Sequence, residues 1–225
     1  MSGAAAPVVI LISGRGTNLQ AILAAVHQQH LPIEVQSVIS NNPRAQGLFI
    51  ARDAGIRTEV IDHRAFAQRH EFDDALMQAI DRHAPRLVLL AGFMRILGTA
   101  FIRHYAGRLL NIHPSLLPAF KGLNTHARAL AAGVQQHGAS VHYVSDDLDG
   151  GPVIIQAPIP VQPSDSIETL AARVLREEHR IYPLAIRWFV EDRLSLRNGQ
   201  VLLDGERRPE QGLTIGIEAR KEAKQ

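Results

Sequence analysis

Short apolar segments alternate with amphipathic ones along the first half of the chain. Residues 7–13, 35–40 and 87–92 are nearly continuous runs of apolar or small residues, which is typical of strands covered on both faces in a parallel sheet. In residues 71–85, apolar side chains recur every fourth position and Pro85 provides a stop, so a helix is expected there. The repetition of strand, helix and strand favours an α/β fold with right-handed crossovers.

The pattern changes after Leu109. Residues 140–144 alternate strictly, and residues 152–161 contain two internal prolines. Because proline cannot donate to a sheet ladder, the second segment predicts a mixed or edge strand rather than another parallel core strand.

A long helix is expected near the end of the chain, over about residues 166–192. Its apolar positions follow one helical face, and Asp165 with Glu168 has a spacing similar to that of a capping box. Pro183 lies inside this pattern and is expected to kink the helix.

Composition favours a single domain. The chain has 225 residues, of which 46% are hydrophobic and 20% charged, enough to bury a sizeable core. We predict one α/β domain over residues 1–225, with a single doubly wound, mostly parallel sheet, helices on both faces, and mixed strands in the C-terminal part. The core is expected over about residues 7–205, including a hairpin turn at Asn198-Gly199, and residues 206–225 are expected to form a peripheral tail that frays at its end.

Charge and cysteine content exclude several classes of function. The chain has 24 Lys and Arg against 22 Asp and Glu, without a basic run, so no nucleic-acid partner is expected. It has no cysteine, which excludes disulfides, thiolate nucleophiles and cysteine zinc sites. The start lacks the basic region of a signal peptide, and no apolar run approaches the roughly 18 residues of a membrane span. We expect a cytoplasmic protein without a membrane partner.

A glycine loop follows the first apolar run, in "SGRGTNLQAIL". Gly14 and Gly16 let the backbone approach a ligand, Thr17 with Gln20 has capping-box spacing, and the free N–H groups at a helix start favour an anion, most naturally phosphate. Leu19 stands where a dinucleotide fingerprint needs its third glycine, and no Gly-Lys-Ser/Thr of a P-loop follows. The alternative is that these are turn glycines without a ligand.

Three polar residues form a candidate catalytic set. Asn111 and His113 are two positions apart on an expected strand, so their side chains project from one face, and Pro114 ends that strand. An amide can donate to a developing oxyanion, an imidazole can move a proton, and the carboxylate of Asp149 can orient the imidazole or a water, as acyl transfer requires. Each residue also has a structural interpretation, as a strand-end amide, a core histidine or a turn residue.

The sequence lacks the motifs of a serine hydrolase and of a zinc protease. The sequence contains no Gly-x-Ser-x-Gly and no His-Glu-x-x-His, and its histidines show no recognisable ligand spacing. The residues alone leave a metal open but give no support for one.

The segments "VILISGRGTNLQAI", "LAGFMRIL", "LLNIHPSLLPAFKG" and "SVHYVSDDLDGGPVIIQ", in this order and at these separations, resemble the folate-dependent formyltransferase family. The resemblance covers about residues 8–188. Asn-x-His and the later Asp are shared by the whole family, whereas the surrounding residues narrow the resemblance to members of purine synthesis that act on glycinamide ribonucleotide.

The resemblance implies direct transfer of a formyl group from the co-substrate 10-formyltetrahydrofolate to the primary amine of glycinamide ribonucleotide, through a tetrahedral intermediate and without a metal. Asn111, His113 and Asp149 are the implied catalytic residues, with Asp149 holding His113 and a proton-carrying water. The implied ribonucleotide-binding residues are Gly14, Arg15, Gly16, Thr17 and Asn18 for the phosphate and Glu178 for the ribose. The implied folate-binding residues are Leu90, Met94, Arg95, Ile96, Leu97, Leu109 and Val144.

Asn124 receives no role, and His126 and His142 are interpreted as structural. Two other functions stay open. A hydrolase of formyltetrahydrofolate, or a formyltransferase of the same fold that acts on another amine, would use the same catalytic residues. A non-catalytic nucleotide-phosphate binding module would need only the glycine loop. The expected assembly is a monomer or homodimer.

Overall fold

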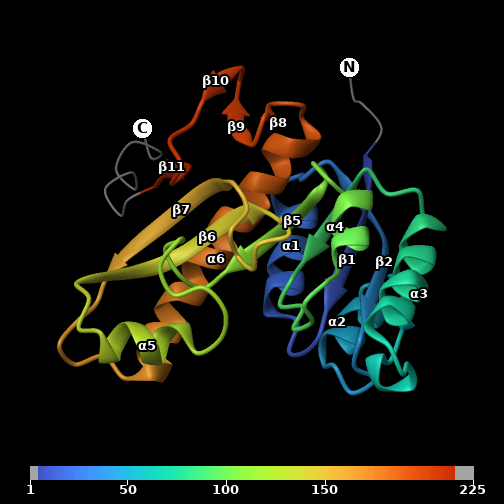
Figure 1. Ribbon diagram of the computed structural model, residues 1–225, viewed down its shortest axis with the longest axis horizontal. Coiled ribbons are helices and arrows are strands. Elements are labelled where there is room, and N and C mark those ends of the chain that lie inside the picture. Colours follow the sequence, from blue (N-terminus) through green and yellow to red (C-terminus); the bar gives the residue numbers. More distant parts are fainter. Residues whose placement is uncertain (1–4, 216–225) are drawn as a thin grey trace. The chain divides into compact units, whose positions relative to one another are not determined.

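The computed structural model describes residues 5–215, and the chain separates into two compact units, Met1–Asn111 and Ile112–Gln225. The first unit is built on parallel strands in the order β5-β4-β1-β2-β3 (Figure 1). Their bounds are β1 Ala6–Ile12, β2 Ile33–Ser40, β3 Thr58–Val60, β4 Leu87–Leu90 and β5 Leu109–His113, the last of which continues into the second unit. Val8, Ile10 and Ile12 of β1 are completely buried, which agrees with the apolar run that predicted this strand.

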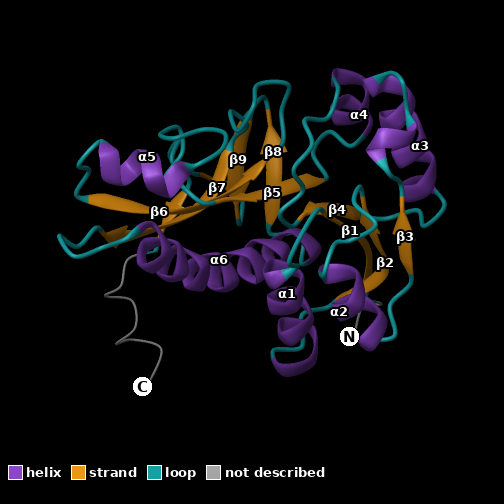
Figure 2. Cartoon of the chain, turned by 90° about the horizontal axis from the view of Figure 1, so that it is seen from below, coloured by secondary structure: helices purple, strands orange, loops and turns teal. Residues whose placement is uncertain are grey.

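Helices lie on both faces of these strands, with α1 and α2 on one face and α3 and α4 on the other (Figure 2). Their bounds are α1 Thr17–Gln28, α2 Gly47–Asp53, α3 Arg69–Asp81 and α4 Thr99–His104, with a short 3₁₀ turn η1 at His63–Ala65. The expected helix before Pro85 is α3, where Glu71 and Gln68 form a capping box.

The second unit contains the mixed strands that the prolines predicted. β6 Gln136–Tyr143 and β7 Val153–Pro160 are antiparallel, and β11 Leu213–Thr214 is parallel to β7. A separate antiparallel sheet contains β8 Leu194–Arg197, β9 Gln200–Leu203 and β10 Glu206–Arg207. The helices are α5 Thr125–Ala131 and α6 Ile167–Val190, and α6 packs on β6 and β7 (Figure 1). The predicted α/β class, with mostly parallel strands and mixed strands in the C-terminal part, is confirmed.

Both predicted capping boxes are wrong in detail. α1 begins after Gly16, whose left-handed conformation (φ 78°) caps the helix without a side-chain hydrogen bond. At α6 the capping pair is Ser166 with Thr169, since each side chain accepts a hydrogen bond from the other residue's backbone N–H. Asp165 instead accepts from the backbone N–H of Gln162 at 2.8 Å, so its carboxylate closes the preceding turn.

The hairpin prediction is confirmed. Arg197 pairs with Gln200 across β8 and β9, and the two turn residues Asn198 and Gly199 have φ values of 49° and 74°, which an Asn-Gly hairpin turn requires. α6 continues through Pro183 without interruption, so the expected kink stays a prediction.

The last described residues take part in a sheet. In the expected peripheral tail, residues 213–214 form β11 beside β7, and Gly212 (φ 69°) approaches the backbone of Ile154 too closely for a Cβ. The expected frayed end, residues 218–225, lies outside the described residues. The single-domain organisation stays a prediction.

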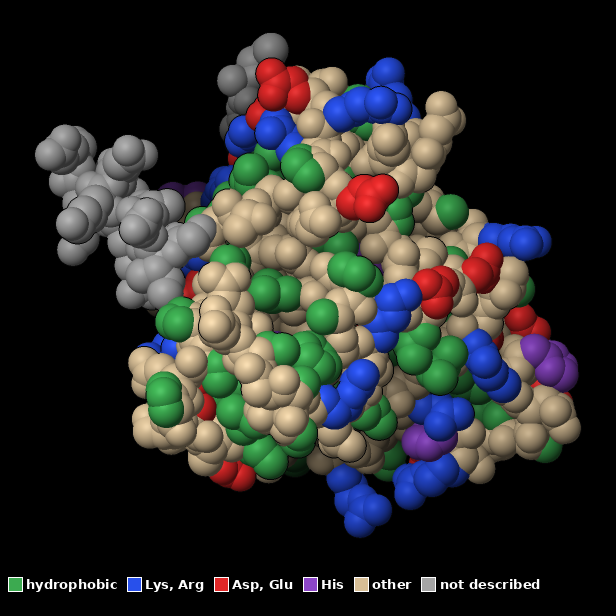
Figure 3. Space-filling model, turned by 60° about the vertical axis from the view of Figure 1, so that its left-hand side comes forward, with side chains coloured by type: hydrophobic (Ala, Val, Ile, Leu, Met, Phe, Trp, Pro, Cys, Tyr) green, Lys and Arg blue, Asp and Glu red, His purple; other side chains and the backbone are tan. Residues whose placement is uncertain are grey.

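The surface carries both signs of charge. On the face in Figure 3, Lys and Arg side chains are interspersed with those of Asp and Glu. Among residues 5–215, no helix is long and apolar enough to cross a membrane.

Candidate active site

His113 and Asp149 come together in the second unit. His113 ends β5, where Pro114 stops the strand, and Asp149 lies in the turn after β6 with φ of 49°. The His113 Nδ1 and Asp149 Oδ2 atoms are 3.4 Å apart, and the two side chains are only 7% and 10% exposed. A carboxylate this close to a buried imidazole can orient the ring and stabilise its charged form.

One backbone segment, residues 120–122, holds both partners. The His113 Nε2–H group donates to the carbonyl oxygen of Phe120 at 3.1 Å, and the backbone N–H of Gly122 donates to Asp149 Oδ2 at 2.8 Å. Since a carbonyl only accepts, Nε2 carries the hydrogen, and Nδ1 is left facing the carboxylate. The pair can therefore hold or release one proton at Nδ1 while the ring stays in place.

His142 faces the same carboxylate from β6. Its Nε2 atom is 3.8 Å from Asp149 Oδ1, and its Nδ1–H group donates to the carbonyl oxygen of Tyr143 at 2.8 Å. Burial lowers the pKa of His142, so this imidazole stays neutral near pH 7. Asp149 thus lies between His113 and a second, neutral imidazole.

Asn111 belongs to the first unit, in the part of β5 that pairs with β4. It lies opposite Leu90 in the parallel register and is half-buried. Its position two residues before His113 places both side chains on the same face of the strand. An amide at that place can donate to an oxyanion that forms near the imidazole.

The glycine loop, residues 14–18, is held by backbone contacts. Gly47 N donates to the carbonyl oxygen of Gly14 at 3.0 Å, and a Cβ on Gly16 would lie 2.6 Å from Gly47 Cα. Gly14 and Arg15 are exposed at the tip, Thr17 is half-buried, and Asn18 is buried in the first turn of α1. The loop therefore presents exposed backbone and the start of a twelve-residue helix, an arrangement that suits an anion.

The expected folate-binding residues of the first unit fall into two groups. Leu90 and Leu109 are 6% and 1% exposed in neighbouring strands, and Leu97 is 5% exposed, whereas Met94 and Ile96 are 66% and 61% exposed. Arg95 is exposed between them. Large apolar side chains exposed next to each other are typical of a surface that a ligand or partner covers.

Two expected binding residues lie in the second unit. Val144 is half-buried just after β6, and Glu178 is 7% exposed in α6. Glu178 has interactions inside the protein.

A comparison with known proteins gives the family. A model described as formyl transferase matches residues 6–186. The chain belongs to the formyl transferase family. The predicted family and fold are thereby confirmed.

Individual members of the formyl transferase family are similar along nearly the whole chain. Phosphoribosylglycinamide formyltransferase of Escherichia coli strain K12 is 53% identical over 205 residues, which cover 91% of this chain and 97% of the relative. The protein of the same name from Haemophilus influenzae is 45% identical over 205 residues, with the same coverage. The solved structure of phosphoribosylglycinamide formyltransferase from Coxiella burnetii has a TM-score of 0.91 and 52% identity, covering 93% of this chain and 99% of that one.

In this formyltransferase, sequence reasoning missed the backbone segment that holds His113 and Asp149. The 120–122 segment acts through a backbone carbonyl and a backbone N–H group, which every residue type except proline supplies, so no side-chain pattern could reveal it. His142, which the sequence suggests is structural, faces Asp149 from β6 at 3.8 Å, and its structural role stays a prediction. Lys121, whose ammonium lies 2.6 Å from Asp147 Oδ2, ties the same segment to the turn that carries Asp149.

The described part of this formyltransferase contains no group of three or more His, Asp or Glu residues arranged to hold a metal ion. His126 and His137, which face each other at 3.2 Å between Nδ1 and Nε2, form a pair only. Burial lowers the pKa of both rings.

Proposed function

We propose that the protein is a phosphoribosylglycinamide formyltransferase of purine biosynthesis. It takes the formyl group of 10-formyltetrahydrofolate and transfers it to the primary amine of glycinamide ribonucleotide, giving formylglycinamide ribonucleotide and tetrahydrofolate. The observation that carries this proposal is the buried His113–Asp149 pair at 3.4 Å, in a chain 53% identical to the E. coli enzyme of that name.

The transfer proceeds through a tetrahedral intermediate. The amine nitrogen attacks the formyl carbon, the carbonyl oxygen becomes an oxyanion, and the bond from that carbon to N10 of the folate breaks. Asn111 donates to the oxyanion, and His113 stabilises the same charge. The proton lost by the amine reaches N10 through a water oriented by Asp149, whose charge also supports the imidazolium of His113.

The ribonucleotide binds through its phosphate and ribose. Backbone N–H groups of the glycine loop and the start of α1 take the phosphate, with Arg15 adding a positive charge at the exposed tip. Glu178 accepts hydrogen bonds from the ribose hydroxyls.

The folate binds along the segment that follows β4. The backbone of Arg95, Ile96 and Leu97 forms hydrogen bonds with the pterin, and Met94 covers it. Leu90, Leu109 and Val144 form its apolar walls. The substrates are small molecules, no metal takes part, and the protein acts in the cytoplasm as a monomer or homodimer, which light scattering of the purified protein distinguishes.

The deciding experiment mixes purified protein with 10-formyltetrahydrofolate, with and without glycinamide ribonucleotide. Formyl transfer that requires the ribonucleotide supports the proposal. Loss of formyl without any amine indicates a hydrolase, and loss with another amine alone indicates a different transferase. A protein that binds the ribonucleotide but never consumes the folate is a binding module.

A further inference from the structure

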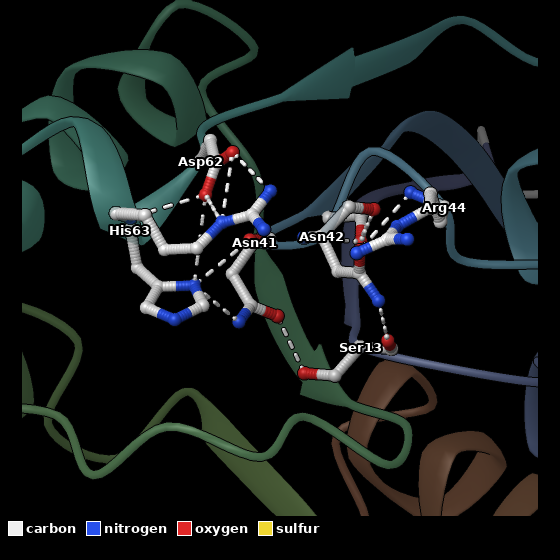
Figure 4. A network of polar contacts seen from close by, with 8 residues as sticks. Ser13, Asn41, Asn42, Arg44, Asp62 and His63 are labelled. Atoms are coloured by element: carbon white, nitrogen blue, oxygen red, sulfur yellow. Dashed lines mark hydrogen bonds and ion pairs between the residues drawn. The ribbon is translucent and has the colours of Figure 1, made fainter.

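Ser13 lies where three loops of the first unit meet. It directly follows β1 and precedes the glycine loop, its backbone N–H donates to the carbonyl oxygen of Gly92 at 3.2 Å, and its own carbonyl accepts from Asn42 Nδ2 at 3.3 Å. Figure 4 shows Ser13 with the polar residues that follow β2. All three loops leave the same ends of the neighbouring parallel strands β2, β1 and β4.

The hydroxyl of Ser13 both accepts and donates a hydrogen bond. It accepts from the backbone N–H of Met94 at 2.7 Å and donates to Asn41 Oδ1 at 2.5 Å. Because the donated hydrogen is fixed on Asn41, a lone pair of the hydroxyl is directed at Met94. The backbone of the segment after β4 therefore depends on the orientation of one side chain.

Asn41 fixes that orientation from the other side. It is 5% exposed, and its Nδ2 atom lies 3.1 Å from His63 Nδ1, which is also 3.0 Å from the carbonyl oxygen of Asn41 (Figure 4). An unprotonated Nδ1 accepts from the amide, and a protonated Nδ1 donates to the carbonyl, so His63 bonds Asn41 in either state. With Nδ1 unprotonated, the Asn41 amide N–H donates to the ring and the amide oxygen stays toward Ser13.

We infer that Ser13 is a positioning residue that couples the glycine loop to the segment Gly92–Leu97, so that an anion bound at the loop tightens folate binding. The inference rests on the proposed function, which assigns the phosphate to the first segment and the folate to the second. Ser13 is covalently next to the loop and hydrogen-bonded to both Gly92 and Met94, so movement of either segment changes the geometry of the other. By linkage, the folate tightens anion binding by the same factor.

The experiment is a calorimetric titration of the wild-type protein with tetrahydrofolate, with and without saturating inorganic phosphate. We expect phosphate to lower the Kd of tetrahydrofolate by about fivefold or more. Ser13→Ala should reduce this ratio to near one, because Met94 N–H and Asn41 Oδ1 lose their shared partner. Ser13→Thr, which keeps a hydroxyl, should restore much of the ratio.

Ser37→Ala is the matched control. Ser37 is a completely buried serine of β2 whose hydroxyl donates to the carbonyl oxygen of Arg57 at 3.4 Å, away from both segments. This variant loses a buried hydroxyl from the same unit and should keep the wild-type ratio. If thermal melting shows that Ser13→Ala does not fold, Ser13→Cys keeps a side chain of the same shape and slightly larger volume with a weaker hydrogen-bonding group, and should also lower the ratio.

The outcomes separate this inference from the proposed function. If the wild-type protein transfers formyl but phosphate does not change its affinity for tetrahydrofolate, the inference alone is overturned. The same holds if Ser13→Ala leaves the ratio of Kd values unchanged. A protein that shows the coupling but no formyl transfer retains the inference while the proposed function fails. A wild-type protein that does not bind tetrahydrofolate contradicts both.

Discussion

At the scale of single residues, Asp149 is distinguished from the two carboxylates beside it. Asp149→Asn keeps an oxygen for the Gly122 N–H group but removes the charge beside His113, so turnover should fall about 10²- to 10⁴-fold. Asp146→Asn and Asp147→Asn should stay near wild type, since both are exposed and Asp147 pairs only with Lys121 among the contacts described. The measurement is the turnover of the three variants at saturating substrates. Similar losses in all three would show that Asp149 has only a structural role in the turn.

Variants of Gly14 and Gly16 distinguish an effect on phosphate binding from an effect on folding. A Cβ at Gly14 meets nothing within 4 Å, whereas one at Gly16 meets the Gly47 backbone at 2.6 Å. Gly14→Val should therefore fold normally and block close approach of the phosphate, raising the KM for the ribonucleotide about tenfold or more and the KM for the folate by much less. Gly16→Val should lower the melting temperature as well. Equal effects of Gly14→Val on both KM values would contradict the proposal that this loop binds the phosphate.

At the scale of elements, the start of α6 depends on the Ser166 cap. The hydroxyl accepts the Thr169 N–H at 3.2 Å, so Ser166→Ala should lower the free energy of unfolding by about 1 kcal/mol. Urea unfolding measures the change. Ser164→Ala removes an exposed hydroxyl two residues earlier and should cost much less; an equal cost would show that the cap does not stabilise the helix.

The misplaced caps show what local sequence leaves undecided at helix ends. Asp165 and Ser166 are both good capping residues, and the choice depends on whether the carboxylate is used elsewhere. It is, because Asp165 accepts from Gln162 and pairs with Arg173 at 2.7 Å. By contrast, β1 and the hairpin at Asn198-Gly199 can be predicted from local sequence. A continuous apolar run indicates a buried strand, and Asn-Gly supplies the two positive φ values that the turn requires.

In the candidate site, too, some features can be predicted from the sequence and others depend on tertiary contacts. The sequence predicts that His113 and Asp149 act together, and the structure places them 3.4 Å apart. The contacts of the 120–122 segment and the hydrogen bond from Met94 to Ser13, which joins residues 81 positions apart, follow from tertiary packing and have no periodic signal. The catalytic and binding roles stay predictions.

At the scale of the whole molecule, buried histidines make stability depend on pH. Burial lowers the pKa of His126, His137 and His142, to about 4 for His137. The unfolded chain protonates these groups near pH 6.5 while the folded protein does not, so stability is lost as pH falls from about 6.5 toward 4. Each group adds a slope of up to about 1.4 kcal/mol per pH unit.

The test compares free energies of unfolding at several pH values in that range. His137→Gln should give a shallower slope than wild type, whatever its effect at pH 7. His70→Gln, which changes an exposed histidine, should leave the slope as it is. A His137→Gln slope equal to that of wild type would contradict the assignment.

The long reach of the Ser13–Met94 hydrogen bond also sets an order of events in refolding. The contact requires β4 to have added to β1, and pairings between residues so distant in the chain form more slowly than helices and hairpins. Helical signal should therefore return before affinity for tetrahydrofolate does. We therefore expect the chain to become an ordered scaffold before it binds tetrahydrofolate.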